Sequence, residues 1–313
     1  MKRELRSAVQ CQGGLGNQLF QLSLALYVNQ GKAVELDFVM KDSKDELKIQ
    51  NGLDSYVLPS STGIRTYKST HFLTNKGLNF ATRLSTYSTK SGKYRALIFM
   101  KRAIVSTYNL VNFTKRDLFV NDGTGYSKFV HSDSKPRKYI GYFQSYRWME
   151  NPIVRKQLMN LELKQKSKWV EQYIGYAQKE IPLVVHVRLG DYLHEEKIGI
   201  PTTDFYKNGI DLLWNQGKFT TIWIFTNDET KARLLLGEIK AKKTRWITDN
   251  QENAAHNLEV MRLGHGYVIS NSTFSWWGAF LSRNPNSPVV APKKWFIGME
   301  DPLDLCPPSW IRI

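Results

Sequence analysis

Three short polar segments of the chain carry side chains that could bind an anion or a small polar ligand. They are HVRLGD at 186–191, TND at 226–228 and SNSTFSWWG at 270–278. In the first segment, Arg188 offers a planar guanidinium that stays charged and suits phosphate oxygens. Asp191 places a carboxylate close to it in sequence. An Arg188–Asp191 ion pair that only holds a turn together explains this segment equally well.

The hydroxyl-rich third segment precedes a helix that we expect to begin near Ser275. The first N–H groups of a helix have no partners inside it, so they attract anions, and hydroxyls beside them favour such a site. Ser272 and Thr273 lie at this predicted helix start. Capping of the helix by these side chains is the simpler explanation, and the pair at 276–277, two tryptophans, is more typical of a core.

Asn227 and Asp228 could hydrogen-bond a nucleobase or a ribose, or they could cap the helix expected from Glu229. Taken one at a time, each of the three segments has such a structural explanation. All three, however, follow predicted strands, and ligands of open α/β sheets bind beyond the carboxyl ends of the strands. This coincidence favours a binding site.

The elements that position these segments alternate along the second half of the chain. The expected strands are 182–187, 221–226, 244–247, 266–270 and 288–291, and the expected helices are 203–216, 229–239, 254–263 and a segment from about 275. Phe205, Ile210 and Leu213 form the inward face of the first helix. The alternation predicts a parallel, doubly wound sheet in a unit that begins near residue 165.

The segment GGLGNQLFQ at 13–21 lies between an expected strand at 8–12 and a helix expected from about Gln18. An apolar stripe supports that helix, made of Leu15, Leu19, Leu22 and Leu26. The glycines match neither the dinucleotide fingerprint nor the P-loop, which disfavours oxidoreductase and kinase classes. A strand–helix turn with Asn17 as N-cap is the simple alternative.

The rest of the first half gives weaker patterns. A strand is expected at 33–38 and another at 139–144. The segment SYRWM at 145–149 follows, with a helix through 163, whereas 42–135 gives only weak signals. The strand–loop–helix–strand start predicts that this half is also an α/β domain.

Composition restricts the partners only loosely. The chain has 313 residues, and 44 basic against 28 acidic residues give a net charge of +16, which favours anionic partners in general. The basic residues are scattered along the chain. No apolar stretch approaches the ~20 residues that span a bilayer, and we expect no signal peptide or anchor. Cys11 and Cys306 have no metal-ligand spacing and are expected to be reduced thiols.

Taken in order, GGLGNQLFQ, HVRLGDY and NSTFSWWGAFL, with FTND between the last two, resemble the α-1,2-fucosyltransferases over residues 10–295. The resemblance implies a GT-B fold, with two Rossmann-like α/β domains facing a central cleft. Residues 1–164 would form the acceptor-side domain and residues 165–313 the domain that binds GDP-fucose. The implied reaction transfers fucose to the 2-hydroxyl of a β-galactoside, with inversion at the anomeric carbon.

The resemblance also assigns roles to the motif residues. Arg188 would hold the β-phosphate of GDP, the His186 backbone would lie near the guanine, and Asp228 with Asn227 would read it. The pyrophosphate would be cradled by four groups, namely Ser272, Thr273, Ser275 and the amide of Trp276. The donor's phosphate and fucose would be approached by Gly14, Gly16 and Asn17.

Two positions depart from the family pattern. Leu189 stands where many members have a second arginine, and Asn257 stands near a position that is usually acidic. The chain has no Asp-x-Asp motif, and the nearest acidic pair, at 35 and 37, lies on a predicted strand. We therefore expect no metal and no cofactor, with the leaving group stabilised by Arg188 and the helix start. Asp191 is the first candidate for the general base and Glu196 the second.

The lack of an anchor in the sequence suggests a bacterial cytoplasmic enzyme that modifies a lipid-linked oligosaccharide for a surface polysaccharide. Its charge of +16 would favour peripheral contact with the anionic inner face of the inner membrane. One alternative is a fucosyltransferase of another linkage, α-1,6 or protein O-linked. Another is a nucleic-acid-binding protein, which would show a concentrated basic face, and the scattered charges give this alternative little support.

Overall fold

The computed structural model describes two compact units. The described residues are 7–29, 34–40, 52–68, 117–121, 125–126, 137–189, 199–237, 239, 243–248, 252–284, 286–297 and 301–313. The first unit comprises Met1–Leu161 and Pro302–Cys306, and the second comprises Glu162–Asp301 and Pro307–Ile313. The sequence did not predict that residues 302–306 belong to the first unit.

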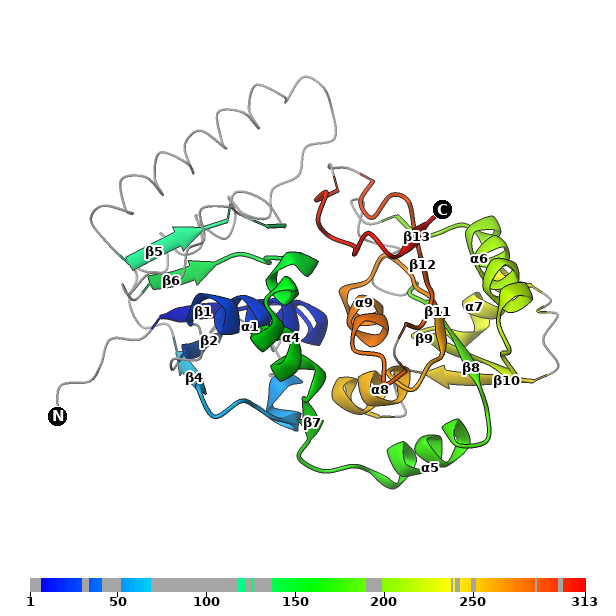
Figure 1. Cartoon of the computed structure of the whole chain (residues 1–313), viewed down its shortest axis with the longest axis horizontal. Coiled ribbons are helices and arrows are strands. Elements are labelled where there is room, and N and C mark those ends of the chain that lie inside the picture. The colour runs from blue at the N-terminus through cyan, green and yellow to red at the C-terminus, as the bar shows by residue number, and fades with distance from the viewer. Residues whose placement is uncertain are drawn as a thin grey trace, which may run out of the picture. The chain divides into compact units, whose positions relative to one another are not determined.

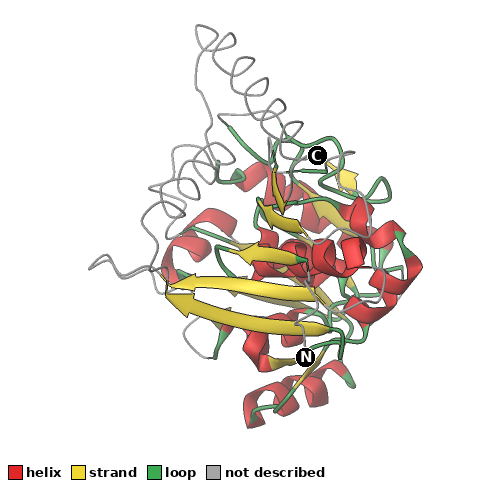
Figure 2. Ribbon diagram, turned by 90° about the vertical axis from the view of Figure 1, so that its left-hand side faces the viewer, coloured by secondary structure: helices red, strands yellow, loops and turns green. Residues whose placement is uncertain are grey.

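The first unit contains a five-stranded parallel sheet with the order β4-β2-β1-β6-β5. Its strands are β1 (Ala8–Cys11), β2 (Val34–Met40), β4 (Thr62–Lys68), β5 (Asp117–Val120) and β6 (Arg137–Ile140). Figure 2 shows strands of this sheet side by side. A 3-10 helix, η1 (Gly52–Ser55), and the short strand β3 (Tyr56–Val57) precede β4. The expectation of an α/β unit here is confirmed, although β4 and β5 were not predicted.

Helix α1 (Leu15–Asn29) follows β1 and begins three residues earlier than expected. The predicted leucine stripe is buried, but so is every other residue of α1 except Asn17 and Tyr27. Asn17 is not the N-cap, because its backbone N–H already donates to the Gly14 carbonyl at 2.9 Å within the first turn. The side chain of Asn17 is therefore not used as a cap.

Strand β6 ends at Ile140, earlier than the predicted residue 144. The backbone leaves the extended conformation there, with φ of 156° at Gly141 and 53° at Phe143. The segment at 145–149 lies largely in the 3-10 helix η3 (Tyr146–Glu150), and the helix expected through residue 163 is α4 (Pro152–Met159), which ends earlier. Pro152 has no N–H to continue the first helix, and Asn151 caps the second one.

The second unit contains a six-stranded parallel sheet with the order β10-β9-β8-β11-β12-β13. The strands are β8 (Pro182–Val187), β9 (Thr221–Thr226), β10 (Thr244–Thr248), β11 (Gly266–Val268), β12 (Val289–Ala291) and β13 (Ile311–Arg312). The predicted doubly wound sheet is confirmed. The short strand β7 (Glu162–Leu163) and the edge strand β13 were not predicted.

Helices cover both faces of this sheet, with α6 and α7 on one face and α8 and α9 on the other (Figure 1). Their bounds are α5 (Lys168–Ala177), α6 (Thr203–Gln216), α7 (Glu229–Leu236), α8 (Ala254–Met261) and α9 (Thr273–Phe280). Leu183, Val185 and Val187 of β8 pack in one core with α6, because alternate residues of a strand face the same side. On the other face, Trp223 of β9 packs edge-on against Tyr173 of α5, with ring centroids 5.2 Å apart.

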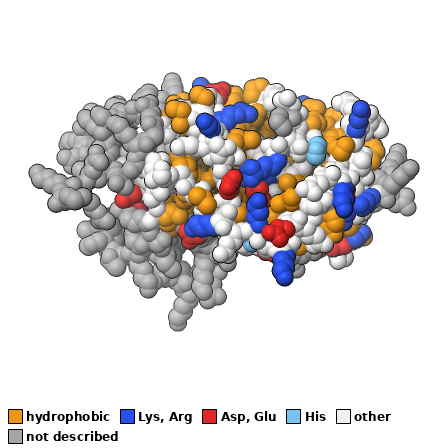
Figure 3. All heavy atoms as spheres, turned by 60° about the horizontal axis from the view of Figure 1, so that its bottom comes forward, with side chains coloured by type: hydrophobic (Ala, Val, Ile, Leu, Met, Phe, Trp, Pro, Cys, Tyr) orange, Lys and Arg blue, Asp and Glu red, His pale blue; other side chains and the backbone are white. Residues whose placement is uncertain are grey.

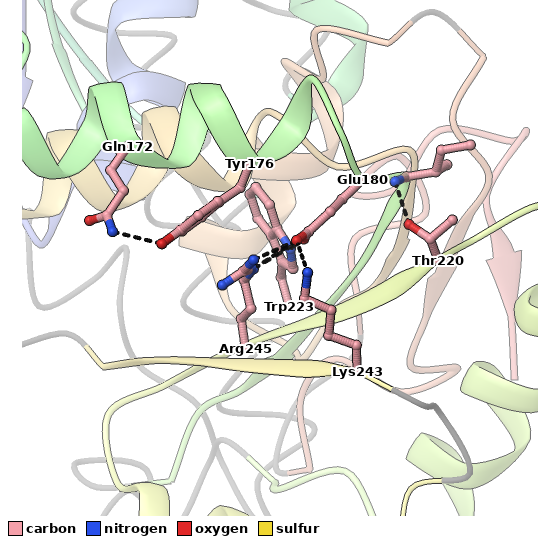
Figure 4. Close-up of polar contacts among 8 residues, drawn as sticks. Gln172, Tyr176, Glu180, Thr220, Trp223, Lys243 and Arg245 are labelled. Carbon is pink, nitrogen blue, oxygen red and sulfur yellow. Dashed lines mark hydrogen bonds and ion pairs between the residues drawn. The ribbon is translucent and has the colours of Figure 1, made fainter.

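The end of this sheet where the strands begin is closed by an ionic network that we call the amino-edge cluster: Glu180, Trp223, Lys243 and Arg245 (Figure 4). One carboxylate oxygen of Glu180 accepts from Trp223 Nε1 at 3.0 Å, and both oxygens accept from Arg245. Burial alone would raise the pKa of Glu180, but the bonds from Arg245, Lys243 and Trp223 lower this pKa to about 2. The guanidinium of Arg245 also stacks on the Tyr176 ring at 3.6 Å.

Cys11 and Cys306 are both buried, and they form no disulfide with each other. Among the described residues, no helix is long and apolar enough to cross a membrane.

Candidate functional site

The three polar segments singled out in the sequence lie at one end of the second sheet. They follow the last residues of β8, β9 and β11, and β8 lies between the other two strands. Because these strands are parallel, their carboxyl ends share one edge of the sheet, which we call the carboxyl edge. The predicted juxtaposition is therefore confirmed.

His186, near the end of β8, ties this edge together. Its Nδ1 lies 2.8 Å from Ser270 Oγ in the segment after β11, and its backbone carbonyl accepts from Tyr206 Oη at 3.2 Å. Burial, together with the nearby charge of Arg188, lowers the pKa of His186 to about 3, so the ring is neutral at physiological pH. Neither Ser270 nor Tyr206 was predicted, and the carbonyl expected near the guanine is bonded to Tyr206.

Arg188 is half-buried and directly follows the buried strand β8. The next residue, Leu189, is 5% exposed and packs in the apolar core, which explains how leucine can replace arginine at this position. The Leu189 amide donates to Asn227 Oδ1 at 2.9 Å, so Asn227 links the loops after β8 and β9. Asp191 and Glu196, the two candidates for the general base, lie outside the described residues.

Asp228 caps helix α7. Its Oδ1 accepts from the Lys231 amide at 3.0 Å, and its Oδ2 forms an ion pair with Lys231 Nζ at 3.0 Å. The amide and the ammonium group of Lys231 both lower the pKa of Asp228. The simpler of the two explanations, helix capping, is thus what the structure shows, and a base contact would have to share these oxygens.

Helix α9 begins at Thr273, two residues before the predicted start, and Ser272 is its N-cap. Ser272 Oγ accepts from the Phe274 amide at 3.3 Å. The Trp276 amide donates to the Ser272 carbonyl at 3.0 Å, and the buried Ser275 hydroxyl donates to the same carbonyl at 3.2 Å. Two groups predicted to cradle a pyrophosphate are therefore bonded within the loop, and the Phe274 amide is capped by Ser272. Half-exposed Thr273, at the first position of the helix, is the predicted group that is placed best for an anion.

Asn271 holds this loop in place, a role that the sequence did not indicate. Its Nδ2 donates to the carbonyls of Gly199 and, at 2.9 Å, Trp295. The residue is 3% exposed, and its Oδ1 is buried without a hydrogen-bond partner among the residues that the structure describes.

The acidic network expected near Asn257 lies two residues further along α8. Asn257 is buried and donates to the carbonyls of Glu252 and Asn253. Glu259 is also buried, and its carboxylate accepts from Arg262 at 2.8 Å and from Arg283 at 2.6 Å. A buried carboxylate is therefore present in this helix, two residues after Asn257.

The glycine segment of the first unit depends on Gly13 rather than on Gly14. Gly13 has a φ of 76°, and a Cβ there would lie 2.5 Å from Asn17 Nδ2. At Gly14 a Cβ would meet nothing within 4 Å. The loop is fastened by glutamines, because Gln18 Nε2 donates to the Gly13 carbonyl at 2.9 Å and the Gln12 amide donates to Gln21 Oε1 at 3.0 Å. Gly16, which was also predicted to approach the donor, is buried within α1.

The acidic pair at 35 and 37 lies on β2, as predicted. Asp37 is fully buried and forms an ion pair with Lys138 at 3.1 Å.

The model of the family described as glycosyl transferase family 11 matches residues 6–297. The chain is 25% identical over 198 residues to an α-1,2-colitosyltransferase of Escherichia coli, covering 60% of this chain and 67% of that protein. It is 26% identical over 329 residues to the O-antigen biosynthesis glycosyltransferase WbnK of Escherichia coli, covering 96% of this chain and 98% of that protein.

Two solved structures share 11% identity with the chain. One is the NodZ α-1,6-fucosyltransferase of Bradyrhizobium crystallised with GDP, with a TM-score of 0.47 over 89% of this chain and 93% of that one. The other is the ADP-heptose heptosyltransferase II of Escherichia coli, with a TM-score of 0.47 over 98% of this chain and 90% of that one.

Proposed function

The chain belongs to glycosyl transferase family 11, and from this we propose that it transfers L-fucose from GDP-fucose to the 2-hydroxyl of a terminal β-galactose. The reaction would invert the configuration at the anomeric carbon. The observation that carries the proposal is the carboxyl edge, where Arg188 and the start of α9 follow neighbouring strands.

The carboxyl edge offers the groups that departure of GDP requires. Arg188 would hold the β-phosphate, and the first turn of α9, with the Ser272 and Thr273 hydroxyls, would face the pyrophosphate. Fixed cations and dipoles of this kind stabilise developing charge without a metal or a cofactor. The guanine would lie near the His186 backbone, Asn227 and Asp228. Ser275 and the Trp276 amide would act by shaping the loop.

In the first unit, Gly14, Gly16 and Asn17 would contribute to binding of the donor phosphate and the sugar. Deprotonation of the acceptor hydroxyl falls to Asp191 in this proposal, with Glu196 as the second candidate. Near-normal turnover by Asp191→Asn would remove Asp191 from that role.

A second donor is favoured by one comparison, because a relative 25% identical to this chain is an α-1,2-colitosyltransferase. Colitose is the 3-deoxy analogue of fucose, so the same edge could accept either nucleotide sugar. Transfer to another position of the acceptor, in α-1,6 or protein O-linkage, is the remaining enzymatic alternative.

The decisive experiment gives the purified protein GDP-fucose with lactose and a panel of Galβ1,3 and Galβ1,4 acceptors. We expect a fucosylated product whose linkage, determined by NMR, is α-1,2. A parallel reaction with GDP-colitose tests the second donor. Absence of product with every acceptor, or a different linkage, would refute the proposed activity.

The natural acceptor that we propose is a lipid-linked oligosaccharide in O-antigen assembly, used at the cytoplasmic face of a membrane. A relative that is 26% identical is named for O-antigen biosynthesis, and the net charge of +16 favours anionic lipid. On the face shown in Figure 3, basic side chains are dispersed among acidic and apolar ones. Binding to liposomes should therefore be weak and salt-dependent. Co-sedimentation that does not depend on the charge of the lipid would contradict the proposed membrane contact.

The face shown in Figure 3 does not carry the concentrated basic surface that the nucleic-acid-binding alternative requires. A salt-dependent shift with DNA, without stabilisation by GDP in thermal melts, would support that alternative instead.

A further inference from the structure

Two carboxamides in the first unit form a directed contact beside the glycine segment. Gln144 Nε2 donates to Asn17 Oδ1 at 2.9 Å, joining the segment after β6 to the first turn of α1. The Asn17 oxygen therefore faces Gln144, and the Asn17 nitrogen lies over the Cα of Gly13, where a Cβ would come within 2.5 Å of it. Among the described residues, none accepts a hydrogen bond from Asn17 Nδ2.

The segment that presents Gln144 is held rigidly at several points. Trp148 Nε1 donates to the Phe143 carbonyl at 2.7 Å, and Ser145 Oγ donates to Asp304 Oδ2 at 2.8 Å. Phe143, directly before Gln144, is fully buried with a φ of 53°. A non-glycine residue in this conformation is strained, and such strain clusters at functional sites because the surrounding structure must maintain it.

The environment of Gln144 is unfavourable for a glutamine side chain. It is 6% exposed, and its Oε1 is buried without a hydrogen-bond partner in the part of the chain that the structure describes. A buried amide oxygen without a partner destabilises the folded state, whereas an apolar side chain of similar size would not. The contribution of Gln144 is therefore the single bond that it donates to Asn17.

We propose that Gln144 is a positioning residue, which orients the Asn17 carboxamide so that Asn17 Nδ2 donates a hydrogen bond to a hydroxyl oxygen of the sugar substrate. A neutral carboxamide donor suits an uncharged hydroxyl, and Gly13 leaves the space that this nitrogen occupies. This inference rests on the proposed function, since it presupposes a sugar substrate.

Two substitutions separate positioning from simple packing. In Gln144→Glu, the introduced carboxylate can only accept, so it holds Asn17 by its nitrogen and turns the Asn17 oxygen toward the substrate. We expect kcat/KM to fall by about 10-fold or more, the size of one lost hydrogen bond. Gln144→Ala leaves Asn17 free to rotate and should lose less activity. If Gln144 acted by packing alone, Gln144→Glu would retain more activity than Gln144→Ala, because glutamate has the shape of glutamine.

The pH profile provides a second measurement. Once protonated, the introduced carboxyl carries an O–H that can donate to Asn17 Oδ1, as Gln144 does. Burial raises the pKa of such a carboxyl. The activity of Gln144→Glu relative to the unsubstituted protein should therefore rise as the pH falls, whereas that of Gln144→Ala should stay constant.

Gln172→Glu is the matched control, since Gln172 is exposed on α5 in the second unit and its side chain donates to a neighbouring tyrosine hydroxyl. It should retain full activity, and all variants should bind GDP normally in thermal melts. If Gln144→Glu does not fold, Asn17→Asp tests the same point, because its carboxylate still accepts from Gln144 but presents an oxygen to the sugar. Asn17→Asp should lose about 10-fold or more.

The outcomes distinguish this inference from the proposed function. An unsubstituted protein without transfer overturns both. Transfer by the unsubstituted protein, with Gln144→Glu as active as or more active than Gln144→Ala at neutral pH, overturns only the role of Gln144. Full activity of Asn17→Asp overturns it as well.

Discussion

The two ends of the second sheet are both lined with polar residues, but they use them differently. In the amino-edge cluster, the Glu180 carboxylate accepts from three side chains, and both of its oxygens are occupied. At the carboxyl edge, Arg188 is half-buried, the first amides of α9 precede the first intrahelical bond, and Asn271 Oδ1 has no hydrogen-bond partner among the described residues. One end is a closed network, and the other is the end where we propose that a ligand binds.

The difference shows that the type of a residue at a strand end does not by itself indicate whether that residue stabilises the fold or binds a ligand. Glu180 and Arg188 stand two residues before and one residue after the same strand, β8. The partners of each group separate a stabilising contact from a binding contact. The predictions below test this separation, from the largest expected effect to the smallest.

Replacing Arg188 should impair the function proposed for the carboxyl edge without affecting the amino-edge cluster. We expect Arg188→Ala to lower kcat/KM for fucose transfer by roughly 10³-fold, because one preorganised charge opposite the leaving phosphate is lost. The melting temperature should change little, since the side chain is half-buried. Arg233→Ala is the control, because Arg233 is exposed and bonds only Glu229 and the Trp246 ring. Equal losses in the two variants would contradict the assignment.

Removing the charge of Glu180 should have the converse effect. In Glu180→Gln, Arg245 and Lys243 lose their common carboxylate, and breaking a buried ion pair costs about 3 kcal/mol of unfolding free energy. Urea denaturation measures this loss. GDP affinity, measured at a temperature where the variant is folded, should match that of the unsubstituted protein, and a large fall in affinity would show that the two ends are coupled.

Acid should act on the two ends in different pH windows. The pKa of His186 is lowered from 6.5 to about 3, so the unfolded chain takes up a proton first and stability falls as the pH drops below 6.5. The pKa of Glu180 is lowered from 4.5 to about 2, so its contribution is complete above pH 4.5 and is lost below it. Each group adds a slope of up to about 1.4 kcal/mol per pH unit.

His186→Gln should therefore flatten the dependence of unfolding free energy on pH between 6.5 and about 3, which includes the range above pH 4.5 where Glu180 contributes no slope. Glu180→Gln should flatten it between 4.5 and about 2 and leave the range above pH 4.5 unchanged. Denaturation curves at a series of pH values measure both slopes, and a common window for the two variants would contradict the separate environments.

Two N-cap serines give the smallest and most closely matched comparison. Ser272 caps α9 at the carboxyl edge and Ser167 caps α5, each accepting from a backbone amide at 3.3 Å. Alanine at either position should cost about 1 kcal/mol of stability. Only Ser272→Ala should also weaken GDP binding, by about 5-fold in calorimetry, since one hydroxyl beside the phosphates is lost. An equal loss of affinity in Ser167→Ala would indicate a general effect of stability.

The second unit could be predicted well because its elements have strong local patterns. Strands β8 and β9 are continuous apolar runs and α6 has a clear stripe, and all three have the predicted bounds. Strand β4, TGIRTYK, mixes polar and apolar residues at a sheet edge, and β13 has only two residues, so neither could be predicted.

The location of the site followed from strand topology, but the bonds within it did not. His186 pairs with Ser270 84 residues away, and Gln144 pairs with Asn17 127 residues away, distances over which spacing carries no information. The capping bonds of Asp228 were considered in advance because they are local. The roles assigned to the motif residues in substrate binding stay predictions.

The return of Pro302–Cys306 to the first unit bears on how such enzymes can be recombined. Within that unit, Asp304 accepts from Ser145 Oγ at 2.8 Å and from the Tyr126 amide at 3.2 Å, and its carbonyl accepts from the Tyr146 amide at 3.0 Å. Neither unit is therefore formed by one continuous segment of the chain. A chimaera that exchanges everything after residue 161 also replaces these five residues, so a graft of donor specificity must keep them from the recipient.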